Sequence, residues 1–175
     1  PFDVARRGLS IGEGAGFALL EKVKSSRADV NLLGYGESSD AHHMSTPHPQ
    51  GEGASRAMRE ALNRAMLIPA DIDYVNFHGT ATPAKDRAED HAVHEVFGGT
   101  TPCSSTKVFT GHTLGAAGIT EAAVALLSIE HGFIPGSPTT EHVDPQNRCN
   151  VVLAGRRGKV KRVMSNSFGF GLCVT

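Results

Sequence analysis

Short apolar segments alternate along the chain with longer segments of helical periodicity, and this alternation constrains the fold most. Residues 51–67 repeat alanine, methionine and leucine at three-to-four spacing and end before Pro69, which predicts a helix. Similar helices are predicted over 85–97 and 115–131, each followed by glycine. Strands are predicted over 14–21, 30–36, 72–77, 102–106, 150–154 and 160–166. Strands that alternate with helices favour an α/β domain whose sheet is covered by helices.

The segment 115–131 is apolar on nearly every side and rich in alanine. A helix of this kind is usually buried on several sides, so we expect it to be the central helix of a layered fold. Glu121 is the one carboxylate in its first four turns. A buried carboxylate needs a cation or hydrogen-bond donors, so we expect Glu121 to have a partner.

Composition narrows the class of protein. The chain has 175 residues, 39% of them hydrophobic, which is enough for one domain with a core. Its formal net charge is −1, and neither a nucleic-acid partner nor a membrane-spanning or secretory segment is expected. The odd number of widely spaced cysteines argues against a disulfide framework and predicts a cytoplasmic protein with ordinary structural thiols, namely Cys103, Cys149 and Cys173. Because the chain starts at Pro1 and stops within an apolar stretch, we expect both ends to be internal to a longer protein.

The first chemically interesting segment, HGTATP at 78–83, directly follows a predicted strand. Ligand and catalytic groups in α/β folds gather at the carboxyl ends of strands, which makes His78 a candidate. The alternative is a surface imidazole that ends the strand.

A second segment, KVFTGHTLGAAG at 107–118, leads into the apolar helix. It could be an ordinary helix start capped by Thr113, with glycines for close packing. That alternative does not explain Lys107 and His112 beside so apolar a helix.

The third segment, NSFGFG at 166–171, alternates phenylalanine with glycine at a strand end. Such a backbone can turn sharply and direct an N–H group at a ligand, as an oxyanion site requires. A core strand with a bulge is the alternative.

Two other chemistries are less favoured. His91 and His94 lie three residues apart on one helix, and His42 adjoins His43, but no metal-binding signature such as HExxH is present. The glycine-rich GEGAG precedes a predicted strand rather than a helix, which disfavours a phosphate site.

Taken in order, the motifs resemble those of one family. PFDVARRGLSIGEGAG at 1–16 and SSDAHHMSTPHPQGEG at 38–53 are followed by HGTATP, Asp86, Glu89, Lys107, GHTLGAAG and NSFGFG. This succession resembles the β-ketoacyl-acyl-carrier-protein synthases of the thiolase-like superfamily. The resemblance implies that residues 1–175 are the C-terminal half of a thiolase-like layered fold, with a mixed sheet covered by helices around a buried central helix. Residues 1–50 would lead into this half, and the N-terminal half with its nucleophilic cysteine would be absent.

The resemblance also implies an activity. Such enzymes carry an acyl chain as a cysteine thioester, decarboxylate malonyl-acyl-carrier protein, and join the resulting carbanion to the acyl group in fatty acid or polyketide synthesis. This chain would supply two histidines. Its partners would be the acyl carrier protein, the missing N-terminal half and, in a homodimer, a second copy; no cofactor would be needed beyond the phosphopantetheine on the carrier. The alternative is a non-catalytic partner resembling chain-length factors.

By position, the resemblance assigns the catalytic roles. His78 and His112 would be the two histidines, and Lys107 the active-site lysine with Glu89 as its partner. Phe170 would be the gating phenylalanine whose backbone N–H helps to form the oxyanion hole.

Other positions would bind the substrate or an ion. Thr80 and Thr82 match threonines that bind the phosphopantetheine arm, with Phe168 beside them. Arg6 matches a basic residue near the pantetheine entrance, with a solvated surface charge as the alternative. The set that matches a buried monovalent-cation site comprises Asn76, Glu121 and Ser165.

Two departures from the family pattern stand out. Lys85 lies where asparagine or glycine is more usual, which predicts an altered loop after Pro83. After Gly171 the chain continues with 172–174 (LCV) instead of the usual Gly-x-Asn, which predicts a different end to the gating loop.

Overall fold

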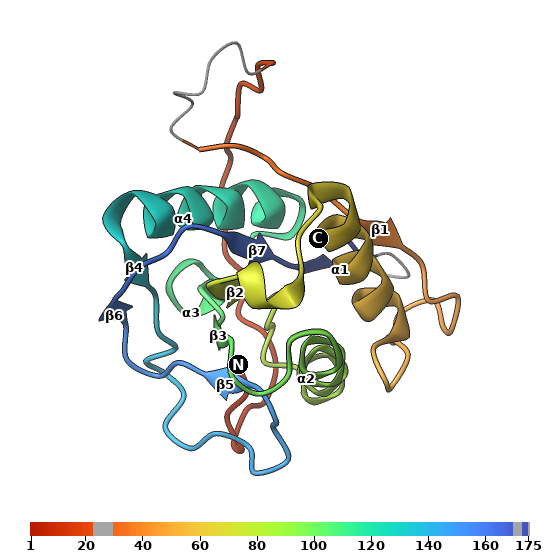
Figure 1. The fold of residues 1–175 in the computed structure, drawn as a ribbon. Coiled ribbons are helices and arrows are strands. Elements are labelled where there is room, and N and C mark those ends of the chain that lie inside the picture. Colours follow the sequence, from red (N-terminus) through yellow and green to blue (C-terminus); the bar gives the residue numbers. More distant parts are fainter. Residues whose placement is uncertain (23–29, 170–172, 175) are drawn as a thin grey trace.

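The computed structural model describes residues 1–22, 30–169 and 173–174, with side chains up to residue 169. Its centre is a four-stranded parallel sheet in the order β5-β3-β2-β7 (Figure 1). The strands are short and pair in register, with Val75 opposite Cys103 on one side and Met164 on the other. They are β2 (Tyr74–Asn76), β3 (Pro102–Ser104), β5 (Asn150–Val151) and β7 (Val163–Ser165).

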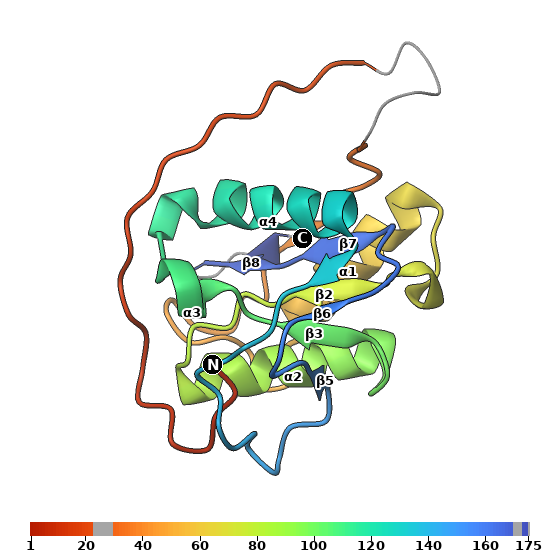
Figure 2. The same ribbon diagram turned by 90° about the vertical axis from the view of Figure 1, so that its left-hand side faces the viewer.

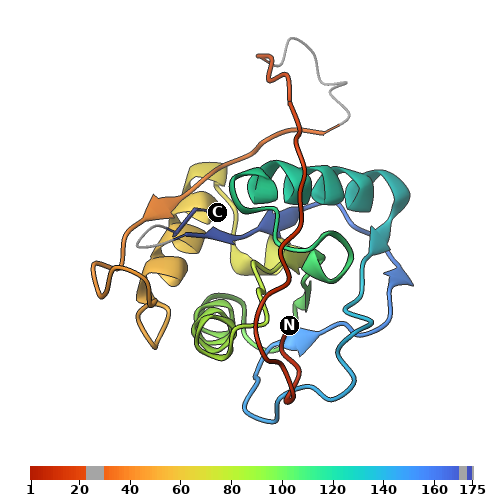
Figure 3. The same cartoon turned by 180° about the vertical axis from the view of Figure 1, so that it is seen from behind.

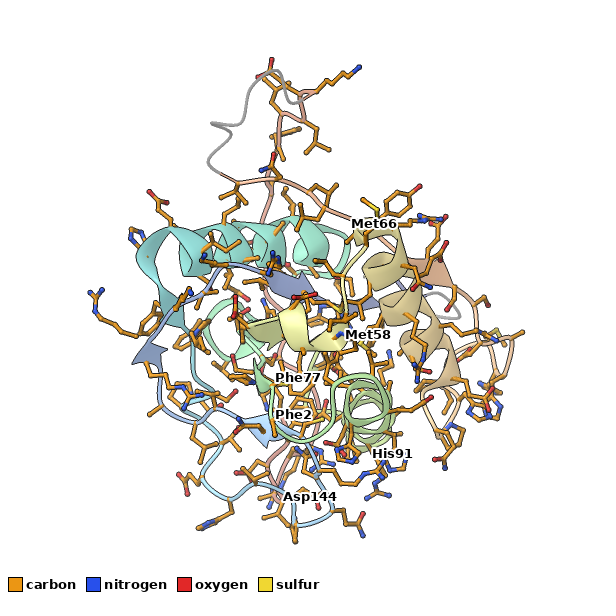
Figure 4. All side chains as sticks on the ribbon, in the orientation of Figure 1. Phe2, Met58, Met66, Phe77, His91 and Asp144 are labelled. Carbon is orange, nitrogen blue, oxygen red and sulfur yellow. The ribbon has the colours of Figure 1, made fainter. Side chains whose placement is uncertain are left out.

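Two helices cover one face of this sheet. The helices α1 (Glu52–Ala65) and α2 (Pro83–Phe97) pack on each other and bury their apolar sides against Val75 and Phe77. Phe2, from the start of the chain, joins this core and its ring lies 4.4 Å from that of Phe77 (Figure 4). Because side chains alternate across a strand, Tyr74 points to the opposite face.

On that opposite face lies α4 (Ala117–His131), which runs along β7 (Figure 2). A smaller apolar cluster of Tyr74, Ile134, Val152 and Val160 forms there, and Ile129 of α4 packs against it. The fold is therefore helix–sheet–helix, which confirms the predicted α/β class.

The other elements are short. They are α3 (Lys107–Thr110), the 3-10 helices Pro69–Asp71 and Leu114–Ala116, and the strands β1 (Glu37–Ser38), β4 (Phe133–Ile134), β6 (Arg156–Arg157), β8 (Ser167–Phe168) and β9 (Cys173–Val174). Antiparallel pairing occurs outside the central sheet, in β1-β9-β8 and β4-β6. None of the helices in the described residues is long and apolar enough to cross a membrane.

Helix boundaries differ slightly from the predicted ones. The first helix ends at Ala65 because Met66 turns into the left-handed conformation, before Pro69 is reached. The second begins at Pro83, whose missing N–H and fixed φ suit the first position of a helix. Thr113 makes no capping bond with its side chain, and α4 starts after the 3-10 turn at Leu114–Ala116.

Two predicted strands are wrong. Residues 14–21 and 30–36 are extended but are not strands, and in this part of the chain β1 begins only at Glu37. Residues 1–22, called the first segment from here on, are held to the body of the molecule by buried Phe2 and Arg6 and then run along its outside (Figures 2 and 3). Phe17 is fully exposed, and no described strand lies beside it to accept a ladder of hydrogen bonds. An apolar pattern alone does not produce a strand where no neighbouring strand is available for pairing.

The burial of α4 also differs from the prediction. Ala117, Glu121 and Ser128 are its buried residues, whereas Leu126 and Leu127 are 46% and 51% exposed. In this chain α4 is thus covered on the sheet side, and the predicted burial on several sides is not observed.

Candidate active site

The His78 loop leaves β2 with its backbone held firmly. The N–H groups of His78 and Gly79 each donate to the carboxylate of Glu89 at 2.8 Å, and the Asn166 side-chain amide donates to the same carboxylate at 3.1 Å. Burial raises the pKa of Glu89 to about 7, although these three donors oppose the rise. Glu89 is therefore an anchor for the loop, placed on α2 beneath it.

His78 itself is buried but has no polar partner. The residue is 3% exposed, and neither nitrogen of its ring has a hydrogen-bond partner among the described residues. Burial, followed by the charge of Lys107, lowers the pKa of His78 well below its usual value of 6.5. A neutral imidazole with unused nitrogens is ready to bind a polar group of a ligand.

The second histidine meets the first edge to face. The rings of His78 and His112 are 5.1 Å apart at an angle of 86°. The backbone of His112 is fixed by residues of the first segment, since its N–H donates to the Ser10 carbonyl at 2.8 Å and its carbonyl accepts from the Gly12 N–H at 3.1 Å. Nδ1 of His112 accepts from the Leu114 N–H at 3.3 Å, which leaves the proton of the neutral ring on Nε2.

Lys107 does not have the predicted partner. Its ammonium contacts the carboxylate of Glu121, and Ser167 donates to the other oxygen of that carboxylate at 3.1 Å. Glu89 is already occupied by three N–H donors, so Lys107 pairs with the acid of α4 instead. The expectation that Glu121 has a partner is thus met, and the positive charge also lowers the pKa of His112 after the larger effect of burial.

A cavity of about 330 Å³ opens beside His112, and Gly79 of the His78 loop also lines it. Thr80 lines it, and the hydroxyl of Thr80 lies 2.9 Å from that of Thr82. The first segment forms one wall through residues 8–10, while Lys107 and His112 form another. Phe168 does not line this cavity, and its ring lies 5.7 Å from that of His78. Phe170 lies outside the described residues.

Arg6 is a buried structural residue. Its guanidinium bridges Asp86 at 3.3 Å and Asp144 at 2.9 Å, and its side chain is 5% exposed. The alternative of a solvated charge is therefore wrong. The ion pairs hold the first segment against α2, and the charge of Arg6 is already balanced by carboxylates.

The predicted cation set is only partly assembled. Asn76 and Ser165 are neighbours across β2 and β7, and the Asn76 amide donates to the Thr106 hydroxyl at 3.3 Å. The Glu121 carboxylate, however, is neutralised by Lys107. A cation is not required to balance that acid, so the donor set does not fit the predicted ion.

The alternative of a multi-histidine metal site finds no assembled ligands. Among the described residues, no three His, Cys, Asp or Glu side chains lie close enough to hold a metal. His91 contacts the side-chain oxygen of Gln50 at 3.1 Å.

Sequence reasoning missed the residues that fix the two histidine loops from behind. Asn166 and Ser105 are fully buried, and Ser10 and Gly12 reach His112 through backbone bonds. A hydrogen bond between main-chain atoms does not depend on the side chain, so it cannot be recognised from the residue types in the sequence. The visible signal was the run of three hydroxyl residues before Lys107, which comprises Ser104, Ser105 and Thr106 at the end of a buried strand.

The family model for the C-terminal domain of β-ketoacyl synthases matches residues 30–141. The chain therefore belongs to the β-ketoacyl synthase family. It is 43% identical to the mitochondrial 3-oxoacyl-[acyl-carrier-protein] synthase of Arabidopsis thaliana, over 98% of this chain and 40% of that protein. The chain thus spans less than half the length of this relative.

Solved structures agree with this assignment. The ishigamide ketosynthase/chain length factor superposes with a TM-score of 0.94 at 36% identity, over 99% of this chain and 45% of that one. A type II polyketide ketosynthase described in complex with its acyl-carrier protein, AntDE:AntF, gives a TM-score of 0.91 at 28% identity over the same shares. The resemblance to thiolase-like condensing enzymes is confirmed.

Proposed function

We propose that this chain is the histidine-bearing part of a β-ketoacyl-acyl-carrier-protein synthase that performs decarboxylative Claisen condensation. The observation that carries the proposal is the imidazole pair, in which buried His78 has two unpartnered nitrogens and faces His112 at 5.1 Å. His112 lines a cavity together with Gly79 and Thr80, which follow His78 in the chain, and the nearby Lys107 disfavours protonation of either ring.

The chemistry fits two neutral imidazoles. When the bond between the carboxylate and the α-carbon of a malonyl thioester breaks, carbon dioxide leaves and the electron pair moves into the thioester as an enolate. Two N–H donors at the enolate oxygen stabilise this charge as it develops, and the surrounding low dielectric strengthens them. Nε2 of His112 carries a proton in the neutral ring, as the donor role requires.

The enolate carbon would then attack the acyl thioester of a cysteine, which leaves as thiolate. We infer that a segment outside these 175 residues supplies that cysteine. Cys103 is buried in the core, Cys149 is part of the edge next to β5, and neither lines the cavity. The side chain of Cys173, in β9, is not among those that the structure describes.

We propose that Thr80 and Thr82 bind the phosphopantetheine arm and that the acyl carrier protein is the partner. Thr80 lines the cavity and its hydroxyl lies 2.9 Å from that of Thr82, which supports the first role. The neighbour described with its acyl-carrier protein supports the second. A homodimer of the complete protein, and a gating role for Phe170, belong to the same proposal.

The test uses the complete protein and the 175-residue chain in parallel. With acyl- and malonyl-carrier protein, the complete protein should form β-ketoacyl-carrier protein detectable by mass spectrometry, whereas the chain alone should form none. Acylation of one of the chain's own cysteines followed by extension would contradict the proposed external nucleophile. Absence of product from the complete protein would favour the non-catalytic, chain-length-factor-like alternative.

A further inference from the structure

Ser105 lies at the junction of three elements of the site without touching the cavity. It follows β3, precedes α3 and is fully buried. Its hydroxyl donates to the Gly79 carbonyl at 2.8 Å and accepts from the Lys107 N–H at 3.4 Å. Its own N–H donates to the Ser137 hydroxyl at 3.3 Å.

These contacts complete the support of the His78 loop. Glu89 binds the N–H groups of His78 and Gly79 from the side of α2, and Ser105 binds the carbonyl of Gly79 from the side of α3. The peptide groups on both sides of Gly79 are thereby fixed. Gly79 has φ of +36°, and a Cβ there would overlap the Ser105 side chain, so only glycine fits at position 79 beside Ser105.

We propose that Ser105 is a positioning residue for the histidine pair. It sets the His78 loop relative to Lys107 and so directs the His78 ring toward His112. This inference rests on the proposed function. His78 has no side-chain hydrogen bond of its own among the described residues, so the direction of its ring depends on its backbone. Small displacements of a catalytic group cost large factors in rate.

Ser104 is a matched control. It is equally buried and adjacent, but its hydroxyl contacts the Pro135 carbonyl at 2.6 Å and the Tyr74 hydroxyl at 2.7 Å. Ser104→Ala therefore removes a buried hydroxyl of the same size without releasing the His78 loop. Any general loss of stability should be similar in the two variants.

The experiment measures malonyl-carrier-protein decarboxylation by the complete protein carrying Ser105→Ala or Ser104→Ala. We expect Ser105→Ala to lower kcat about five- to tenfold with KM changed less than about twofold, because the loop that carries His78 loses the hydrogen bond from the Ser105 hydroxyl, worth about 1 kcal/mol net. Ser104→Ala should keep kcat within about twofold of the wild type. Equal losses of kcat in both variants would overturn the inference.

A second readout does not need activity. The NMR signals of the His78 ring should shift in Ser105→Ala and stay in place in Ser104→Ala; an unmoved His78 in Ser105→Ala would overturn the inference even if the wild type proved inactive. Should Ser105→Ala fail to fold, Ser137→Ala removes only the acceptor of the Ser105 N–H. It should shift the same signals to a smaller extent, and their constancy would also count against the role of Ser105.

Discussion

At the scale of single residues, the site depends on buried polar groups whose partners are backbone atoms. His78 and His112 were predicted as a pair from their motifs, and the fold places their rings in contact range. The partner of Lys107 could not be predicted from the sequence. The sequence shows which carboxylates are available, but it does not show which of them already accept hydrogen bonds from other donors. For this reason Glu121 pairs with Lys107 in place of Glu89, and Glu89 holds the His78 loop instead.

The raised pKa of Glu89 predicts a pH-dependent stability. In the unfolded chain its carboxyl has a pKa near 4.5, and in the folded protein the pKa is about 7. Between these values the folded state holds a proton on Glu89 that the unfolded state lacks, so the contribution of Glu89 to the free energy of unfolding should fall as pH rises from about 5 to 7. The full effect is at most about 3 kcal/mol.

Urea unfolding across this pH range measures the effect, and Glu89→Gln isolates it. The variant should be less stable overall, since an amide cannot accept from all three N–H donors. The lowered pKa values of His78 and His112 act in the opposite direction over this range, but they are common to both proteins. The stability difference between wild type and variant should therefore shrink from about pH 5 to 7, and a constant or growing difference would contradict the raised pKa of Glu89.

At the scale of elements, the long helices and the four strands of the central sheet were predictable, whereas the short strands outside that sheet were not. The three long helices were found because an amphipathic or strongly apolar pattern persists over several turns. Strands of two residues, such as β4 and β6, carry too short a pattern, and residues 14–21 show that an apolar pattern without a neighbouring strand does not form one. The four-residue helix α3 is held by contacts distant in sequence, as its first residue Lys107 bonds to α4.

The ion pair between α3 and α4 is expected to be a strong link. Lys107→Met should destabilise the protein by about 3 kcal/mol or more, because the Glu121 carboxylate would remain buried without its cation. The double variant Lys107→Met/Glu121→Gln should recover much of that loss.

Thermal unfolding of the two variants checks this link. A double variant as unstable as Lys107→Met alone would show that the loss comes from packing rather than from the unpaired charge. In the single variant the pKa of His112 should also rise, because one of the charges that lowers it is gone.

At the scale of the whole molecule, the chain has a complete sheet with helices on both faces but leaves much apolar surface exposed. Phe17, Leu19 and Leu20 of the first segment and Leu126 and Leu127 of α4 are all exposed. Single exposed apolar side chains are ordinary, but a group of them usually marks a contact surface. Exposed apolar side chains are in keeping with a chain that spans 40% of its Arabidopsis relative. The proposal that the rest of the protein supplies the cysteine remains a prediction.

The most direct test of the central claim is carbon dioxide release from malonyl-acyl-carrier protein by the complete protein and its histidine variants. His78→Ala and His112→Ala should each lower the rate on the order of 10²-fold or more, since each removes one donor at the enolate oxygen. His91→Ala, on α2 and bonded to Gln50, is the control and should leave the rate unchanged. Wild-type rates in either His78→Ala or His112→Ala would contradict the account.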